Sequence, residues 1–337
     1  MNTGIYILTG YLGSGKTTLL QNLLAYLREQ GGNVVVLMNE MGEEDIDGEQ
    51  IQGFGFPVKK MLDGCICCSI RGELTEGLKE VITTLHPHHV LIETTGVADP
   101  IDVVDAMTHP ELFDKIDLKG IITVVDSSRF LDLNSRFQSS SSLVATIRNQ
   151  VKYADLILLN KIDLVNEDTL QKVKRKLLDL NAAAPLYHTI HSEMDLPSLL
   201  EVKRLAKQVE NADRNVAVSP VQKTIGKFSP LDKIKQSLGM KPAQPSLFNS
   251  IETFSYHFKG PVDEKKFEIF LLNLPKTVYR AKGYVLFKEK QELISFQQTE
   301  NQVHLIPFEN FGPKMVAVFI GEGLDKEKII AELEKCY

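Results

Sequence analysis

A glycine-rich loop near the start of the chain has the residue types and spacing of a phosphate-binding site. Residues 10–17 read GYLGSGKT, which matches GxxxxGK[ST] and lies between an apolar run at 5–9 and a helical pattern at 17–29. Glycines allow backbone N–H groups to turn toward phosphates, and a helix start adds the positive end of its dipole. We expect Lys16 to reach the β- and γ-phosphates of a nucleotide and the Thr17 hydroxyl to hold Mg²⁺. The predicted nucleotide ligands in this loop are Gly10, Gly13, Ser14, Gly15, Lys16, Thr17 and Thr18.

A second motif indicates which base the nucleotide carries. Asn160, Lys161 and Asp163 form an NKxD pattern at the end of an apolar run at 156–160. The carboxylate of Asp163 can accept two hydrogen bonds, from the ring N–H and the exocyclic amine of guanine. Adenine offers no such donor pair, and sites built on buried hydrogen bonds reject the wrong ligand strongly. We expect Lys161 to pack its stem along the base and Asn160 to tie this loop to the phosphate loop.

A carboxylate stands at the end of the apolar run 90–94. Glu93 is followed three residues later by Gly96. In phosphate-loop enzymes this position faces the Mg²⁺ and the γ-phosphate, so Glu93 could hold a magnesium water or orient the attacking water. The Gly96 N–H could sense the γ-phosphate. With Lys16 and Thr17 these residues form the predicted catalytic group; the alternative is a glutamate that only caps a turn.

Three of the four cysteines lie within four positions, at Cys65, Cys67 and Cys68. Thiolates are soft ligands for Zn²⁺, Cu(I) and other thiophilic ions, and cysteines this crowded suit a reducing compartment better than a disulfide framework. Three ligands leave a tetrahedral site open, and water, Glu40 or a client protein could supply the fourth. An open site suits the exchange of a metal. The alternatives are buried structural cysteines or a redox pair.

The position of this cluster suggests that a nucleotide could control it. The cysteines lie between the acidic segment 39–49, where the first switch of a GTPase would fall, and the tip at 93–96. Both neighbours should respond to the γ-phosphate. A metal site between them could therefore be well formed with GTP and disturbed with GDP.

The remaining candidates for chemistry are weaker. His86, His88 and His89 could form a surface metal patch, although a solvated loop is the favoured interpretation. We expect His109 to be structural or solvent-facing and Cys336 to be an incidental thiol.

The elements that must position these residues predict a doubly wound, mostly parallel α/β sheet of the P-loop NTPase type. Short runs of Val, Ile and Leu alternate with helical patterns up to about residue 195, as buried parallel strands require. The predicted strands are 5–9, 34–38, 90–94, 121–126 and 156–160.

The rest of the chain predicts a connector and a smaller C-terminal α+β domain. We expect a GTPase domain at 1–210, an irregular basic and Pro-containing connector at 211–246, and the small domain at 247–337. The predicted strands of the last are 253–258, 284–287, 292–297, 303–307 and 315–320, and its predicted helices are 263–272 and 326–335.

Composition restricts the partners and the compartment. A formal net charge of −6 gives no general attraction to nucleic acid or to an anionic membrane. The first apolar run is too short for a signal peptide, and no run approaches the ~18 apolar residues of a membrane span. We therefore expect a cytoplasmic protein that uses neither partner.

Taken together, the motifs resemble the CobW-like family of P-loop GTPases. The resemblance rests on GYLGSGKTT, CICC, ETTGVADP and NKID in this order. The segment NEMGE at 39–43 is similar to the family's NEFGE, with Met41 in place of Phe, and RAKG at 280–283 resembles its RxKG signature. The resemblance therefore spans nearly the whole chain.

The resemblance implies a GTP-hydrolysing metallochaperone or metal-insertion factor that serves a metal-dependent client protein. It implies GTP/GDP and Mg²⁺ as cofactors, and Zn²⁺, or Co²⁺, as the transferred metal at Cys65, Cys67 and Cys68, with Glu40 as a helper. Many zinc-linked members carry a His-rich tract that this chain lacks, which argues against metal storage. The alternatives are a regulatory or assembly GTPase with structural cysteines, and an ATP-dependent kinase or chelatase subunit, against which Asp163 argues.

Overall fold

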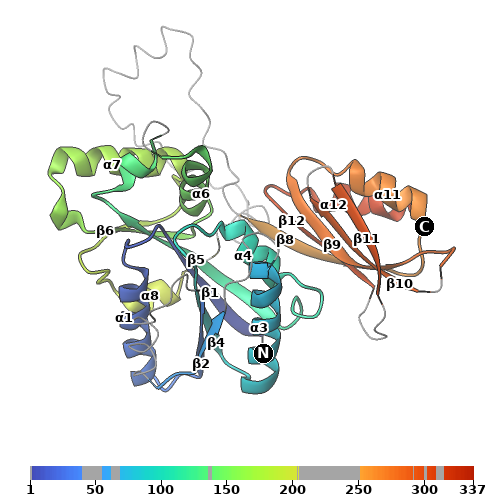
Figure 1. The fold of residues 1–337 in the computed structure, drawn as a ribbon, viewed down its shortest axis with the longest axis horizontal. Helices are drawn as coiled ribbons and strands as arrows, with labels where there is room; N and C mark the ends of the chain where they lie inside the picture. Colours follow the sequence, from blue (N-terminus) through green and yellow to red (C-terminus); the bar gives the residue numbers. More distant parts are fainter. Residues whose placement is uncertain are drawn as a thin grey trace, which may run out of the picture.

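Two sheets, one in each half of the chain, organise the protein (Figure 1). The computed structural model describes residues 2–39, 55–61, 69–135, 139–202, 204, 251–290, 292–299, 302–308 and 315–337. The predicted fold class is confirmed: a P-loop-type α/β sheet is followed by a smaller α+β domain. The predicted connector at 211–246 lies outside the described residues.

The first sheet has seven strands in the order β3-β2-β4-β1-β5-β6-β7, and all its pairings are parallel. The strands are β1 (Thr3–Thr9), β2 (Val34–Asn39), β3 (Val58–Met61), β4 (His89–Glu93), β5 (Ile116–Asp126), β6 (Leu156–Asn160) and β7 (Leu186–His188). The helices are α1 (Lys16–Glu29), α3 (Ser69–Leu85), α4 (Pro100–Met107), α5 (Phe130–Leu133), α6 (Ser141–Lys152), α7 (Glu167–Leu180) and α8 (Leu196–Leu200), with a 3₁₀ turn η1 at Ile162–Leu164.

Strand residues alternate between the two faces of this sheet, and helices cover both. On β1, Ile5 and Ile7 pack toward α3 and α4, whereas Tyr6 and Leu8 pack toward α1 and α8. Figure 1 shows α1 and α8 on one side of the strands and α3 and α4 on the other. Burial on both faces explains why the strands are nearly continuous apolar runs.

Parallel pairing brings the carboxyl ends of the strands to one edge of the sheet. Ligands of open α/β sheets bind at this edge, where the strand order changes direction. β1 lies between β4 and β5. The last residues of β1, β4 and β5 are Thr9, Glu93 and Asp126. Asn160 is the last residue of β6, which pairs with β5.

The second sheet has five antiparallel strands in the order β11-β10-β9-β12-β8. The strands are β8 (Glu252–His257), β9 (Val278–Leu286), β10 (Leu293–Thr299), β11 (Gln302–Phe308) and β12 (Val316–Gly321), and the helices are α11 (Glu264–Leu272) and α12 (Lys326–Glu334). Both helices cover one face, where Phe267 is fully buried among the rings of Phe258, Phe287 and Phe296.

The strand predictions need four corrections, one of which is that β5 begins at Ile116 rather than at 121. Two short strands at the edges of the first sheet, β3 and β7, had no predicted counterpart, because each spans four residues or fewer and is only partly buried where described. β9 begins at Val278 rather than at 284. Its first half alternates apolar residues with Arg280 and Lys282, which face the other domain, so it does not look like a buried strand in the sequence.

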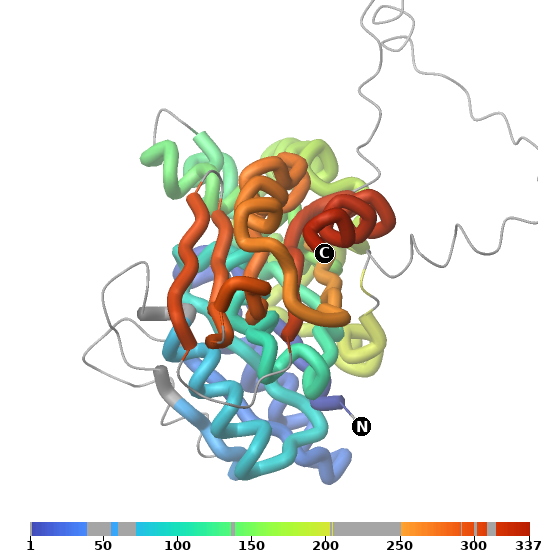
Figure 2. The backbone as a smooth tube through the Cα atoms, turned by 90° about the vertical axis from the view of Figure 1, so that its right-hand side faces the viewer, coloured from blue at the N-terminus to red at the C-terminus, as the bar shows by residue number. Residues whose placement is uncertain are grey.

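The open face of the second sheet packs on the first domain. Figure 2 looks onto the C-terminal domain, which lies in front of α3 and α4. From β9, Arg280 and Lys282 pair with the 3% exposed carboxylate of Asp105 on α4. Nearby, Lys152 at the end of α6 reaches Glu322 over 2.6 Å. The contacts are both apolar and ionic, since Ile320 belongs to the core cluster of the first domain.

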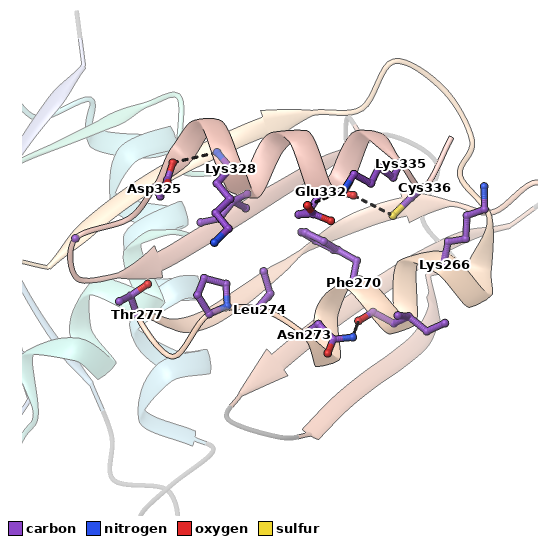
Figure 3. Close-up of a pocket in the computed structure, with 14 residues that line it drawn as sticks. Lys266, Phe270, Asn273, Leu274, Thr277, Asp325, Lys328, Glu332, Lys335 and Cys336 are labelled. Atoms are coloured by element: carbon purple, nitrogen blue, oxygen red, sulfur yellow. Dashed lines mark hydrogen bonds and ion pairs between the residues drawn. The ribbon is translucent and has the colours of Figure 1, made fainter.

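A groove of about 800 Å³ lies on the outer side of the C-terminal domain, between α11 and α12 (Figure 3). Phe270 and Leu274 line it together with Lys266 and Lys328. Cys336 also lines the groove, and burial raises the pKa of its thiol to about 11. The thiol is therefore protonated at neutral pH and is a poor metal ligand.

Within the described residues, no helix has the length and apolar character needed to cross a membrane.

Candidate nucleotide-binding site

The loop between β1 and α1 has a backbone that only glycine can adopt at two positions. Gly10 has φ of 137° and Gly15 has φ of 112°. A Cβ atom at Gly10 would lie 2.1 Å from the carbonyl oxygen of Val124, and one at Gly15 would lie 2.4 Å from Nδ2 of Asn160. The loop is thus pressed against the ends of β5 and β6, with its N–H groups free of side-chain bulk.

Lys16, in the first turn of α1, is a cation held in this loop. Lys16 is only 6% exposed, and its Nζ donates to the carbonyl oxygens of Gly10 at 2.9 Å and Tyr11 at 3.4 Å. Burial lowers the pKa of Lys16, and the nearby carboxylate of Glu93 opposes that shift. A desolvated ammonium group that bonds to carbonyl oxygens of its own loop is well placed to turn to phosphate oxygens.

Thr17 and Glu93 bring two oxygen ligands together beside Lys16. The Thr17 hydroxyl donates to Oε1 of Glu93 over 2.9 Å, and Glu93 is 7% exposed at the end of β4. Mg²⁺ prefers oxygen ligands and keeps several waters, so this donor set fits the ion. Thr17 would hold it directly and Glu93 through its water shell, and the ion would neutralise phosphate charge.

Gly96 lies directly against the phosphate loop. A Cβ atom at this position would be 2.4 Å from the backbone nitrogen of Leu12, so any side chain would displace one of the two segments. The loop after β4 and the phosphate loop therefore form a single surface where a γ-phosphate would lie.

Asn160, at the end of β6, connects the base side of the site to the phosphate loop. Its Nδ2 donates to the carbonyl oxygen of Ser14 at 2.9 Å and to Oγ of Ser192 at 3.0 Å. Its Oδ1 accepts from the N–H of Ser192 at 2.9 Å and from the hydroxyl of Thr189 at 3.1 Å. The residue is 2% exposed, so it serves as a buried crosslink between three segments.

Lys161 and Asp163 follow in a turn that leaves the sheet. Lys161 has φ of 59°, and its Nζ lies 2.6 Å from the carbonyl oxygen of Gly13 and 2.8 Å from Oδ2 of Asp126. Although burial raises the pKa of Asp126, hydrogen bonds from Lys161 and Ser128 hold it below its usual value. Asp163 is exposed in η1, where a base could reach it. The assignment of these residues as nucleotide ligands stays a prediction.

Sequence reasoning missed several residues that build this site. Asp126 could have been recognised as an acid that ends an apolar strand run, as Glu93 was. Ser192 gives no local signal, because its role depends on a backbone turn with φ of 56°. Gln150, whose Nε2 donates to the carbonyl oxygen of Gly96, leaves a weak signal, an amide on the apolar stripe of α6 that also carries Val144 and Ile147.

The candidate metal ligands are less fully described. Cys65, Cys67, Cys68 and Glu40 lie outside the described residues. Of the histidines, His89 begins β4 and so lies at the opposite end of that strand from Glu93. In the part of the chain that the structure describes, no three His, Cys, Asp or Glu side chains are arranged to hold a metal ion.

Comparison with known proteins gives two family matches that together cover most of the chain. Residues 4–188 match the family described as "CobW/HypB/UreG, nucleotide-binding domain", and residues 251–337 match the "Cobalamin synthesis protein cobW C-terminal domain". Among curated relatives, "Zinc chaperone YjiA" of Escherichia coli is 34% identical over 198 residues, 57% of this chain and 59% of that protein. "Zinc chaperone YeiR" of the same organism is 32% identical over 189 residues, 56% of each. The aligned chain thus spans little more than half the length of the curated relatives it matches.

The comparison with solved structures finds proteins that align with much of the chain. The Zn(II)-bound YjiA GTPase from E. coli aligns over 100% of this chain and 99% of its own, at 25% identity and a TM-score of 0.46. HypB from Helicobacter pylori in complex with nickel covers 65% of this chain and 92% of its own, at 17% identity and a TM-score of 0.41. Because the nucleotide-binding match extends over more than half of the chain, the chain belongs to the CobW/HypB/UreG family of P-loop GTPases, with a CobW-type C-terminal domain.

Proposed function

We propose that this chain hydrolyses GTP and uses the nucleotide cycle to load and release a thiophilic divalent metal at Cys65, Cys67 and Cys68. Zn²⁺ is the first candidate for that metal and Co²⁺ the second. The observation that carries the nucleotide part is the convergence of Lys16, Thr17 and Glu93 at the carboxyl edge of the sheet.

Hydrolysis at this site would depend on charge stabilisation more than on covalent chemistry. Phosphoryl transfer spreads negative charge over the transferred group, and fixed cations and N–H donors in a desolvated site stabilise it. Lys16 is the buried cation, and the glycines of its loop present the N–H donors. Glu93, whose Oε1 accepts a hydrogen bond from Thr17 at the sheet edge, would orient the attacking water.

The chain's route through the sheet supports a link between nucleotide and metal. β3 ends at Met61, next to the cysteine segment, and Met61 is paired in register with Asn39, the last residue of β2. One strand further, Met38 is paired with Glu93. The described chain therefore enters the cysteine segment at the same sheet edge as Glu93 and resumes at Ser69, the first residue of α3.

The names of curated relatives support a metal as the cargo, and the properties of the fourth cysteine support the cluster Cys65, Cys67 and Cys68 as its site. Curated relatives carry the name zinc chaperone at about one third identity. The fourth cysteine, Cys336, is unsuited to the role because burial raises the pKa of its thiol to about 11. A metal-dependent client protein would receive the ion, and the open three-thiolate set would allow its transfer.

The test is a metal titration in two nucleotide states. Purified protein is titrated with Zn²⁺ and with Co²⁺, once with GDP and once with a non-hydrolysable GTP analogue, and GTP and ATP turnover are measured alongside. We expect GTP to be the preferred substrate and the metal to bind about 5- to 150-fold more tightly with the GTP analogue. Linkage requires the metal to raise GTP affinity by the same factor.

Two variants separate the cysteine cluster from other thiols. The triple substitution Cys65→Ser, Cys67→Ser, Cys68→Ser should abolish metal binding, whereas the control Cys336→Ser should leave it unchanged. Equal metal affinity in both nucleotide states would instead support a regulatory GTPase in which the cysteines are structural. Full metal binding by the triple variant would move the site elsewhere, with His86, His88 and His89 examined next.

A further inference from the structure

Helix α6 carries a buried amide that holds the loop following β4. Nε2 of Gln150 donates to the carbonyl oxygens of Gly96 at 3.2 Å and Ala98 at 3.1 Å. Gln150 is 1% exposed and occupies a core-facing position of α6. The two N–H groups of one amide thus satisfy two carbonyl groups of a loop that has no regular hydrogen-bond ladder of its own.

The helix that presents this amide is itself fixed at several points. The hydroxyl of Thr123, on β5, donates to the backbone oxygen of Gln150 over 2.6 Å. The next strand residue is Val124, whose carbonyl oxygen limits the backbone of Gly10 in the phosphate loop. At the carboxyl end of α6, Asn181 donates to the carbonyl oxygens of Val151, Lys152 and Ala154. Gln150 is therefore a rigid support rather than a mobile side chain.

A neighbouring contact continues the same support. Nδ2 of Asn149 donates to Oδ2 of Asp99 over 2.6 Å, while Oδ1 of Asp99 caps α4 through the N–H of Ile101. Residues 96–99 are thus held by consecutive residues of α6, and their far end is tied to the start of α4.

The position of this loop matters because Gly96 abuts the phosphate loop. A Cβ atom on Gly96 would be 2.4 Å from the backbone nitrogen of Leu12, so a small shift of Gly96 changes the surface that meets a γ-phosphate. The side of the site that would bind the base is held separately, by hydrogen bonds among Asn160, Thr189 and Ser192.

We propose that Gln150 is a positioning residue for GTP hydrolysis, which fixes the loop 96–98 so that Gly96 and Glu93 meet the γ-phosphate in the reactive arrangement. The inference rests on the proposed GTPase function and adds a residue of α6 to it. It requires Gln150 to affect turnover and the distinction between GTP and GDP, and to leave the affinity for GDP unchanged, because GDP lacks the γ-phosphate.

The experiment compares Gln150→Met with the wild-type full-length chain. Methionine has a similar volume and fills the same space, but it donates no hydrogen bond to Gly96 or Ala98. We expect kcat to fall about 10- to 100-fold, because a misplaced loop disturbs the alignment of the reacting groups. The affinity for a non-hydrolysable GTP analogue should fall, while the affinity for GDP should stay within about twofold.

A second variant and a control exclude a general loss of structure. Gln150→Asn keeps an amide but is one methylene group shorter, so its N–H groups fall short of Gly96 and Ala98, and it should reproduce the kinetic defect even if Gln150→Met folds poorly. Thr3→Val is the control: it removes a buried side-chain hydrogen bond, from the hydroxyl of Thr3 to the carbonyl oxygen of Pro87, at the end of β1 opposite the phosphate loop. It should lower the thermal midpoint and leave kcat of the folded protein near the wild-type value.

The outcomes separate this inference from the function on which it rests. Wild-type protein without GTP turnover would overturn both. Active wild type together with unchanged kcat in both Gln150 variants would overturn the positioning role alone. An equal loss of GDP and GTP-analogue affinity, or an equal loss of kcat in Thr3→Val, would also overturn it, because either result describes a structural residue.

Discussion

The hydroxyl of Thr17 donates a hydrogen bond of 2.9 Å to Oε1 of Glu93, which joins the first turn of α1 to the end of β4. Both atoms are hard oxygen ligands. In the nucleotide-bound protein a lone pair of the Thr17 oxygen would bind Mg²⁺, while the hydroxyl proton could keep its hydrogen bond to Glu93. Glu93 is therefore poised between two partners, the hydroxyl and the hydrated ion.

This relationship predicts a specific defect for Glu93→Gln. The amide keeps the shape of the side chain but carries no charge to orient a magnesium water or an attacking water. We expect kcat for GTP to fall about 10²- to 10³-fold, as when one electrostatic stabiliser is removed, and half-saturation to need more Mg²⁺. Steady-state turnover across a Mg²⁺ series checks this. The exposed Glu289→Gln should behave as wild type, and normal turnover by Glu93→Gln would rule out a catalytic role for Glu93.

The base preference depends on Asp163. Two hydrogen bonds to an ionised acceptor contribute about 1.5–3 kcal/mol each, so Asp163→Ala should weaken GTP binding by about 3 kcal/mol or more. The preference for GTP over ATP should shrink with it. Calorimetric titration with GDP and ADP measures both effects. Asp168→Ala, which removes an exposed carboxylate from the first turn of α7, is the control. A wild-type protein that bound ADP and GDP equally would contradict the assignment of guanine.

The domain interface should depend on Asp105, whose carboxylate is 3% exposed and pairs with Arg280 and Lys282. Although burial raises its pKa, the two cations hold the pKa of Asp105 below its usual value. Arg280→Ala would leave the buried carboxylate with Lys282 as its remaining cation, so it should cost at most about 3 kcal/mol of unfolding free energy.

A surface pair provides the comparison for this interface. Lys259 and Glu334 are 72% and 42% exposed, so Lys259→Ala should change the unfolding free energy far less than Arg280→Ala does. Urea denaturation of the two variants measures the difference. Asp105→Asn combined with Arg280→Ala should lower the unfolding free energy by less than the sum of the two single variants; a double variant as unstable as that sum would contradict the pairing.

The stability of the protein should fall in mildly acidic solution because of His109. Burial, with Lys79 and Lys282 nearby, lowers the pKa of His109 from 6.5 to about 4. At a pH between these two pKa values, His109 is protonated in the unfolded chain and neutral in the folded one. Stability therefore rises with pH in this window and is lost as pH falls through it.

The variant His109→Phe isolates this contribution. Phenylalanine keeps a ring beside Tyr284, whose ring centroid lies 6.3 Å from that of His109, but it cannot titrate. Thermal midpoints at pH 6.5 and pH 4.5 should differ less in His109→Phe than in the wild type. His304→Phe changes an exposed histidine on β11 and should leave the wild-type slope intact. An unaltered slope in His109→Phe would assign the acid sensitivity to other groups.

The sequence alone determined the features that depend on neighbouring residues. The apolar run at 156–160 predicted β6 at its observed bounds, Leu156–Asn160, because a strand buried on both faces needs no polar alternation. The phosphate loop could be recognised for a similar reason, since its glycines are required by a local backbone shape between a strand and a helix. β9 was found only in part, because Arg280 and Lys282 face another domain rather than solvent or core.

The tertiary structure alone decided which distant residues meet. Gln150 reaches Gly96 across 54 positions, Asn160 reaches Ser14 across 146, and Arg280 reaches Asp105 across 175. Periodicity in a sequence can show that a side chain faces the interior, but not which partner residue it contacts there. That partner is fixed by strand order and helix packing, which pair residues through space, and therefore the support of the loop 96–98 could be identified only in the folded chain.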